Sequence, residues 1–146
     1  RTPSSAASDV YKRQGVAIKA QEMALDYVPQ RETFGAPLST RQSIQWMLVD
    51  NDIDIKQSLW IILEAAAKAQ QGEAFRKEAA MAKLVATEAG GRVVDRCMQM
   101  FGGLGVAKDL PFERWYREMR IRRIGEGPSE VQRHVIAREL LGASLR

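Results

Sequence analysis

The sequence has few of the residues that build disulfide bridges and metal sites. It contains one cysteine, Cys97, and one histidine, His134. A single cysteine cannot form an internal disulfide, so this composition is typical of a reducing compartment. Because CxxC pairs are absent and only one histidine is available, the sequence argues against a structural zinc site, and we predict no metal ligands.

Long apolar runs and alternating strands are also absent. Hydrophobic residues make up 45% of the sequence and charged residues 27%, as in ordinary globular domains. No apolar run reaches the roughly 20 residues that a membrane-crossing helix needs, and no segment keeps the apolar–polar alternation of a half-buried strand. The formal net charge of +4 suits an anionic ligand, but so small an excess equally suits solubility.

Apolar residues recur instead at the three- and four-residue spacing of helices. Pro29 ends or disturbs the first helix, Ser39 or Thr40 can cap the second, and Gly72 is a natural stop. We expect helices over residues 16–27, from about 40 to 71, from 73 to 101, from 111 to the segment before 126, and from about 129 to 141. The sequence therefore predicts an all-α fold, an antiparallel bundle of four to five helices.

The first fourteen residues differ from the rest of the sequence. Residues 4–8 are small and polar, and no helical apolar stripe crosses residues 1–14. We therefore expect residues 1–14 to be a disordered or non-native tail, such as translated adapter sequence, ahead of a helical domain spanning residues 15–146. A native flexible terminus is the alternative.

The most informative segment surrounds Glu126, which lies between Gly125 and Gly127 and is followed by Pro128. Glycine permits backbone conformations closed to other residues and lets a ligand approach closely, and proline commonly opens a helix. We expect Glu126 on a tight loop that leads into a helix, a suitable place for a catalytic base whose pKa apolar neighbours would raise. A surface loop glutamate is the alternative.

Two further segments could bind a ligand. The loop over residues 31–35 combines an arginine, a hydroxyl and an aromatic ring, which can hold a phosphate and a flat ring together; alternatively, it connects two helices and Phe34 plugs the core. Gln99 precedes glycines at 102, 103 and 105, and such an amide with bare backbone can bind a polar cofactor edge. This segment is not a dinucleotide fingerprint, because GxGxxG is absent, and a simple helix end is the alternative.

The predicted fourth helix is rich in arginine and carries Trp115 and Tyr116, as some nucleic-acid binders do. The aromatic residues, however, fall on its apolar side, and Glu113 and Glu118 dilute the positive charge. We therefore interpret this stretch as a solvated face and predict no nucleic-acid partner.

Together, three segments resemble the C-terminal helical domain of the acyl-CoA dehydrogenases, over residues 15 to about 141. Residues 31–35 with Gln42 resemble the RxTFG…Q segment of that family, residues 99–105 its QxxGGxG segment, and residues 126–138 its EGxxEIQR…IAR segment. Each motif is weak alone, but three in order, separated by helices of fitting length, are specific. The sequence departs from the family pattern at Gly125 and Val106, where aromatic residues are common, and at Pro128, where threonine is common.

The resemblance implies an FAD-dependent acyl-CoA dehydrogenase that oxidises acyl-CoA to trans-2-enoyl-CoA. It implies that Glu126 removes the α proton while the β hydrogen leaves as hydride to the flavin, and that Gly127 and Arg138 lie towards the substrate. The residues implied to contact FAD are Arg31, Thr33, Phe34, Gln42, Gln99, Gly102, Gly103, Ser129 and Glu130. Those before residue 43 are expected to reach the flavin of a neighbouring subunit.

The same resemblance implies the partners and the setting of the complete protein. They are an acyl-CoA substrate, an electron-transferring flavoprotein, and a homodimer or homotetramer in the bacterial cytoplasm or the mitochondrial matrix. The family's first helical domain and middle β-domain have no counterpart in this sequence, so we expect a fragment that is inactive alone. The alternatives are a stand-alone helical module for oligomerisation or basic-surface binding, and a fragment of a related flavoenzyme such as an acyl-CoA oxidase.

Overall fold

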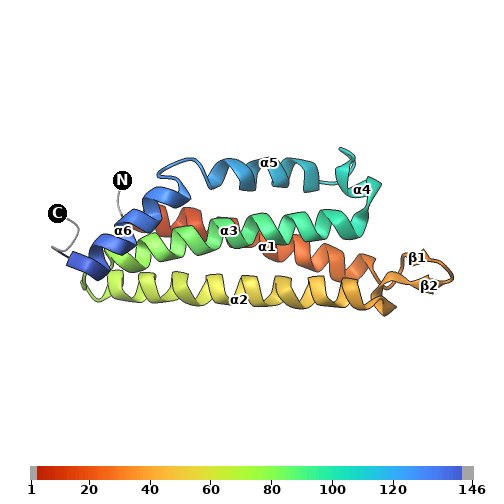
Figure 1. Cartoon of the computed structure of the whole chain (residues 1–146), viewed down its shortest axis with the longest axis horizontal. Coiled ribbons are helices and arrows are strands. Elements are labelled where there is room, and N and C mark those ends of the chain that lie inside the picture. Colours follow the sequence, from red (N-terminus) through yellow and green to blue (C-terminus); the bar gives the residue numbers. More distant parts are fainter. Residues whose placement is uncertain (1–2, 143–146) are drawn as a thin grey trace.

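The computed structural model describes residues 3–142, and side chains from residue 14. Helices account for most of this part of the chain (Figure 1). The helices are α1 (Pro3–Tyr27), α2 (Gln42–Gln70), α3 (Arg76–Phe101), the single turn α4 (Gly103–Val106), α5 (Phe112–Arg122) and α6 (Ser129–Leu141). A 3-10 turn, η1 (Leu38–Thr40), and two short strands, β1 (Glu32–Thr33) and β2 (Ala36–Pro37), lie between α1 and α2. The predicted all-α antiparallel bundle is confirmed.

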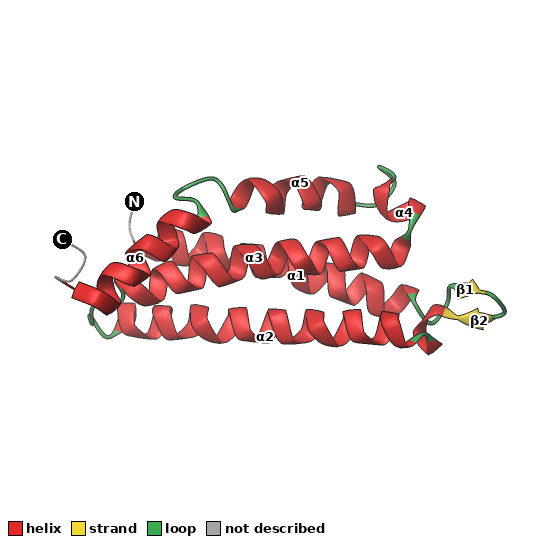
Figure 2. Cartoon of the chain, in the orientation of Figure 1, coloured by secondary structure: helices red, strands yellow, loops and turns green. Residues whose placement is uncertain are grey.

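Helix α3 lies at the centre of the bundle and contacts α1, α2, α5 and α6 (Figures 1 and 2). Its buried residues are mostly small and include Ala82, Ala86 and Ala89. Small side chains let neighbouring helices approach closely, so one helix can contact several others. None of the described helices is long and apolar enough to cross a membrane.

An aromatic cluster fastens α5 to the bundle. The rings of Tyr27 and Phe101 stack with centroids 4.1 Å apart, Phe101 contacts Phe112 at 4.7 Å, and Trp115 meets Phe112 edge-on at 5.7 Å. Phe112, on the first turn of α5, is 0% exposed. Because the chain after α5 leads directly to Glu126, this cluster fixes where that loop begins.

The start of the chain differs from the sequence prediction. Helix α1 begins at Pro3, whereas we expected residues 1–14 to be loose. An apolar stripe is not required for a helix, because the backbone hydrogen bonds form within the segment, and alanine and serine are compatible with that conformation. The side chain of Gln14 is already buried. Residues 1–2 lie outside the described part, and the non-native origin of the tail stays a prediction.

The connection between α1 and α2 also differs from the prediction. The residue that caps α2 is Arg41, without a side-chain hydrogen bond, so the predicted cap at Ser39 or Thr40 is wrong. The hydroxyl of Thr40 donates instead to the carbonyl of Pro37 at 2.7 Å, inside the turn η1. Strands β1 and β2 form an antiparallel hairpin in which Glu32 pairs with Pro37, and two-residue strands are too short to show alternation in the sequence.

Helix α2 buries polar residues among the apolar ones on its inward face. Its buried residues include Asn51, Asp54 and Ser58. The carboxylate of Asp54 accepts hydrogen bonds from Arg92 at 2.5 Å and from Arg96 at 2.7 Å. Pairing of this kind is what makes a buried charge tolerable, so the polar face of α2 is held against α3 by ion pairs.

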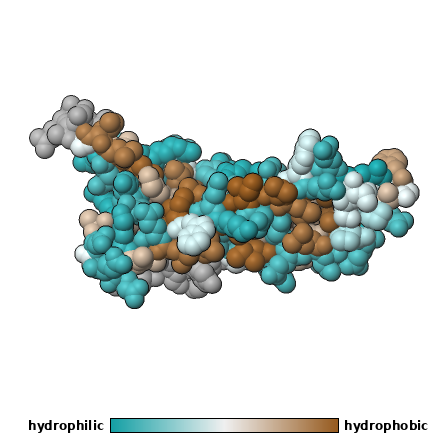
Figure 3. Space-filling view, turned by 90° about the horizontal axis from the view of Figure 1, so that it is seen from below, coloured by the Kyte–Doolittle hydropathy of each residue, from teal (hydrophilic) through white to brown (hydrophobic). Residues whose placement is uncertain are grey.

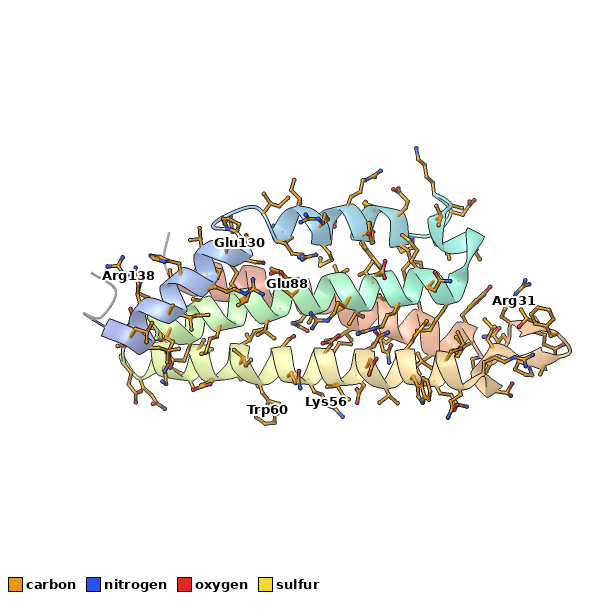
Figure 4. All side chains as sticks on the ribbon, viewed as in Figure 1. Arg31, Lys56, Trp60, Glu88, Glu130 and Arg138 are labelled. Carbon is orange, nitrogen blue, oxygen red and sulfur yellow. The ribbon has the colours of Figure 1, made fainter. Side chains whose placement is uncertain are left out.

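Apolar side chains of α2 also lie at the surface. Exposed apolar side chains along this helix are Trp46, Val49, Ile53, Trp60 and Leu63. Figure 3, seen from the α2 side, shows brown apolar surface along this face, and Trp60 projects from it in Figure 4. Helix α2 therefore carries apolar side chains on its outer face as well as on the face that packs inward, where Ile44, Met47 and Ile55 contact the core.

The ion pairs of Asp54 predict a pH dependence of stability. Burial raises the pKa of Asp54, but hydrogen bonds and charges from Arg92 and Arg96 outweigh burial and leave this pKa below its ordinary value of 3.8. Because the unfolded carboxylate takes up a proton at higher pH than the folded one, its contribution is present above pH about 4 and is lost as the pH falls through the lowered pKa.

We therefore expect the stability advantage of the wild-type chain over Asp54→Asn to shrink below pH about 4. Urea unfolding from pH about 7 to about 2.5 measures this advantage, with Asp52→Asn, at an exposed position on the same helix, as the control. An advantage that stays constant over this range would contradict the assignment.

Candidate functional site

Glu126 lies on a short loop between α5 and α6, and its backbone conformation is unusual. Its φ angle is +57°, and that of Gly127 is +87°. A non-glycine residue with positive φ is uncommon, and such strain, of order 1–3 kcal/mol, persists only where the surroundings fix it. Pro128 precedes the first residue of α6, so the predicted loop leading into a helix is present.

Lys83, on α3, holds the middle of this loop. Its ammonium group donates to the carbonyl oxygens of Gly125 at 2.7 Å, of Glu126 at 2.9 Å and of Gly127. The Gly127 carbonyl also accepts from the side-chain amide of Gln132 at 3.0 Å. These bonds direct three successive carbonyls towards α3.

Glu88, also on α3, holds both ends of the same loop. One carboxylate oxygen accepts from the hydroxyl of Ser129 at 2.7 Å, and the other pairs with Arg123 at 2.8 Å. Burial raises the pKa of Glu88, but the Ser129 hydrogen bond and the Arg123 charge outweigh it, so this pKa lies below its ordinary value. The Glu88 carboxylate is therefore charged at neutral pH and contacts both Ser129 and Arg123.

The sequence motifs do not include Lys83 or Glu88. The available signal was weak: two charged residues interrupt the alanine-rich stretch around Ala82, Ala86 and Ala89. Charged residues on a long helix usually belong to a solvated face, and nothing in the spacing indicates that these two meet a loop more than 30 residues away. Figure 4 shows Glu88 on the side of α3 that faces α6.

The side chain of Glu126 is exposed. We expected apolar neighbours to enclose it, and the described residues do not provide that enclosure. The apolar side chains nearest in sequence, Ile124 and Val131, are themselves about half exposed. The loop thus presents the carboxylate at the surface of the bundle, on a backbone that is firmly fixed.

The predicted ligand-binding loop of residues 31–35 lies at the opposite end of the bundle (Figures 1 and 4). Arg31 is exposed and Phe34 is 99% exposed at the hairpin tip, so the alternative in which Phe34 plugs the core is wrong. Arg41 donates to the carbonyl of Thr33 at 2.6 Å, which fastens the hairpin to the start of α2, where Gln42 is exposed.

Gln99, Gly102 and Gly103 lie at the same end as the hairpin, where α3 finishes, and all three are exposed. The predicted break after Phe101 is occupied by the single turn α4. Lys83, which contacts the Glu126 loop, and Phe101 are about 27 Å apart along α3, from the helical rise per residue. One chain therefore does not bring the three motifs together: two lie at one end of the bundle, and the Glu126 loop lies towards the other.

The remaining predicted residues lie on α6. Glu130 and Arg138 are exposed and extend from α6 in Figure 4. Ser129, in contrast, is buried, and its hydroxyl is bonded to Glu88. Of the side chains predicted to contact FAD, Ser129 is thus the one whose polar group is directed into the bundle.

Comparison with known proteins identifies the class. A sequence profile described as "Acyl-CoA dehydrogenase, C-terminal domain" matches residues 9–141, and the chain belongs to this family. Bovine mitochondrial short-chain specific acyl-CoA dehydrogenase is 42% identical over 127 residues, which cover 87% of this chain and 31% of that protein.

Solved structures agree with this assignment. Butyryl-CoA dehydrogenase from Megasphaera elsdenii superposes with a TM-score of 0.89 and 36% identity, over 93% of this chain and 36% of that one. PigA in complex with FAD superposes with a TM-score of 0.85 and 27% identity, over 88% of this chain and 33% of that one. The chain thus spans about a third of the length of the relatives it matches.

Proposed function

We propose that this chain is the C-terminal helical part of an FAD-dependent acyl-CoA dehydrogenase in which Glu126 is the catalytic base. The observation that carries the proposal is the Glu126 loop: a carboxylate at the surface, on a left-handed backbone fixed by bonds from α3. A base must be held within hydrogen-bond reach of the proton that it removes. A rigid loop meets that requirement better than a mobile surface glutamate does.

The reaction makes two demands on the protein. The α proton of an acyl thioester is weakly acidic until hydrogen bonds polarise the carbonyl, so positioning and electrostatic stabilisation matter as much as the base. The Glu126 carboxylate takes this proton while the double bond forms between the α and β carbons. FAD, when bound, supplies the acceptor for the β hydrogen, which leaves as hydride. Gly127 and Arg138 lie towards the substrate in this proposal.

The far end of the bundle offers groups that fit FAD. Arg31 can pair with a phosphate in two hydrogen bonds, and the exposed ring of Phe34 can contact a flat ring. Gly102 and Gly103 have no atom within 4 Å of where a Cβ would lie, so their backbone is open to a ligand. The remaining FAD contacts in the proposal come from Thr33, Gln42, Gln99, Ser129 and Glu130, with Ser129 acting through its backbone.

The separation of the two ends supports an assembly of several copies. Because the hairpin lies far from Glu126 in one chain (Figure 1), we propose that it reaches the flavin of a neighbouring subunit in a homodimer or homotetramer. The exposed apolar face of α2 is consistent with such contacts. The names of the relatives favour a short-chain acyl-CoA substrate. From the family resemblance, we also propose an electron-transferring flavoprotein as acceptor and the bacterial cytoplasm or mitochondrial matrix as location.

Cofactor binding by two chains of different length tests this proposal. The 146-residue chain should purify colourless and should not turn over acyl-CoA, because most of the flavin-holding residues lie outside it. The complete protein should purify with bound flavin and be bleached by butyryl-CoA without oxygen. A short chain that retains flavin would contradict the fragment interpretation. A complete protein with bound flavin that no acyl-CoA reduces would contradict the proposed activity.

A further inference from the structure

We propose that Lys83 and Glu88 are positioning residues that hold the Glu126 loop in its reactive conformation. We call these two side chains on α3 the loop clamp. This inference rests on the proposed function, because it assigns Glu126 the role of base. It adds two residues outside the three motifs on which the family resemblance depends.

The bonds of Lys83 fix the part of the loop that carries the base. An ammonium group has three donor hydrogens, and three successive carbonyls, those of residues 125–127, converge on it. Successive carbonyls do not converge in extended or right-handed helical backbone. Here they converge because the chain turns through positive φ at Glu126 and Gly127. Loss of the ammonium group would remove the main contact that favours this turn over relaxed backbone.

Glu88 holds the two ends of the Glu126 loop together. Arg123 comes before the turn and Ser129 after it, yet both bond to the same carboxylate. The amide of Ser129 also donates to the carbonyl of Arg123 at 3.2 Å. Both ends are therefore fixed to one side chain, and the middle is fixed to Lys83 less than two turns earlier on the same helix.

Several of these contacts are shielded from water. Ser129 is buried, and Arg123, Lys83, Glu88 and Gly127 are only partly exposed. Hydrogen bonds to charged groups are stronger than neutral ones, and partial burial reduces their screening by salt. The loop clamp thus holds, from the bundle side, the backbone that carries the exposed side chain of Glu126.

Two substitutions in the complete protein test the proposal. Lys83→Met keeps the aliphatic stem and removes the donors, and Lys77→Met makes the same change elsewhere on α3 as the control. We expect Lys83→Met to lower kcat and the rate of α-proton exchange by about 10²-fold, the order of loss that misplacement by about 1 Å causes. The KM for acyl-CoA, the FAD content and the Tm should stay near those of the control, a split that a purely structural role would not produce.

Glu88 gives a second variant that keeps the test decisive if Lys83→Met folds poorly. Glu88→Gln can still accept from Ser129 but loses the charge that pairs with Arg123, whereas Glu88→Ala loses both contacts. We expect a graded fall in kcat, smaller for Gln than for Ala. Equal activity in both variants and in the wild type would overturn the role of Glu88.

Hydrogen exchange on the 146-residue chain tests the loop clamp without any enzymatic activity. Lys83→Met should speed amide exchange in residues 123–129 and leave α1 and α2 unchanged, relative to Lys77→Met. Unchanged exchange and unchanged kcat in Lys83→Met, with Glu126→Gln inactive, would overturn the loop clamp alone. Full activity of Glu126→Gln would instead overturn the proposed base.

Discussion

Glu126→Gln in the complete protein is expected to slow flavin reduction by acyl-CoA about 10²- to 10⁴-fold, the usual contribution of a general base. Glutamine keeps the size of the side chain but cannot take up the α proton. Because the loop is held through backbone carbonyls and through Glu88, the substitution leaves every one of those contacts in place. The loop and the FAD content should therefore change little.

Rapid mixing of each variant with butyryl-CoA in the absence of oxygen measures this rate. Glu118→Gln is the matched control, since Glu118 is an exposed glutamate on α5 with only a surface ion pair to Arg114. The control should reduce at the wild-type rate. Equal rates for Glu126→Gln and Glu118→Gln would remove Glu126 from the chemistry.

Phe112→Ala is expected to lower the free energy of unfolding by about 3–5 kcal/mol, the usual cost of truncating a buried phenylalanine. The ring is fully buried between Phe101 and Trp115. Its removal leaves a cavity where α5 meets α3. The loss should therefore also loosen the segment that leads to Glu126.

Denaturant unfolding of the 146-residue chain measures this loss. Phe34→Ala is the control, because that ring lies at the hairpin tip and is 99% exposed; it should cost less than about 0.5 kcal/mol. A similar cost for both substitutions would show that the aromatic cluster does not stabilise α5 in this way.

The sequence predicted the helical bundle well because helical spacing and glycine or proline boundaries act locally. Pro29 and Gly72 each follow a helix closely, as expected. The buried polar residues of α2 were not predicted. Buried Asp54 is tolerated because Arg92 and Arg96 reach it from α3. The spacing of residues within one helix does not predict which charged residues of another helix it will pair with.

The arrangement of the candidate site residues did not follow from the sequence. Motif resemblance selected Arg31, Gln99 and Glu126, but their placement at two ends of the bundle depends on how the helices pack (Figure 1). Lys83 and Glu88 could not be found from motifs. Their roles arise from contacts with a loop some 40 residues later in the chain, and such contacts exist only in the folded molecule.

Exchange of the α hydrogen of an acyl-CoA with deuterated water, followed by mass spectrometry, isolates the step assigned to Glu126. The complete protein should incorporate deuterium at the α carbon. Glu126→Gln should incorporate none above the uncatalysed background while it retains bound FAD. Incorporation by Glu126→Gln at the wild-type rate would show that another group removes the proton and would contradict the assignment of Glu126 as the catalytic base.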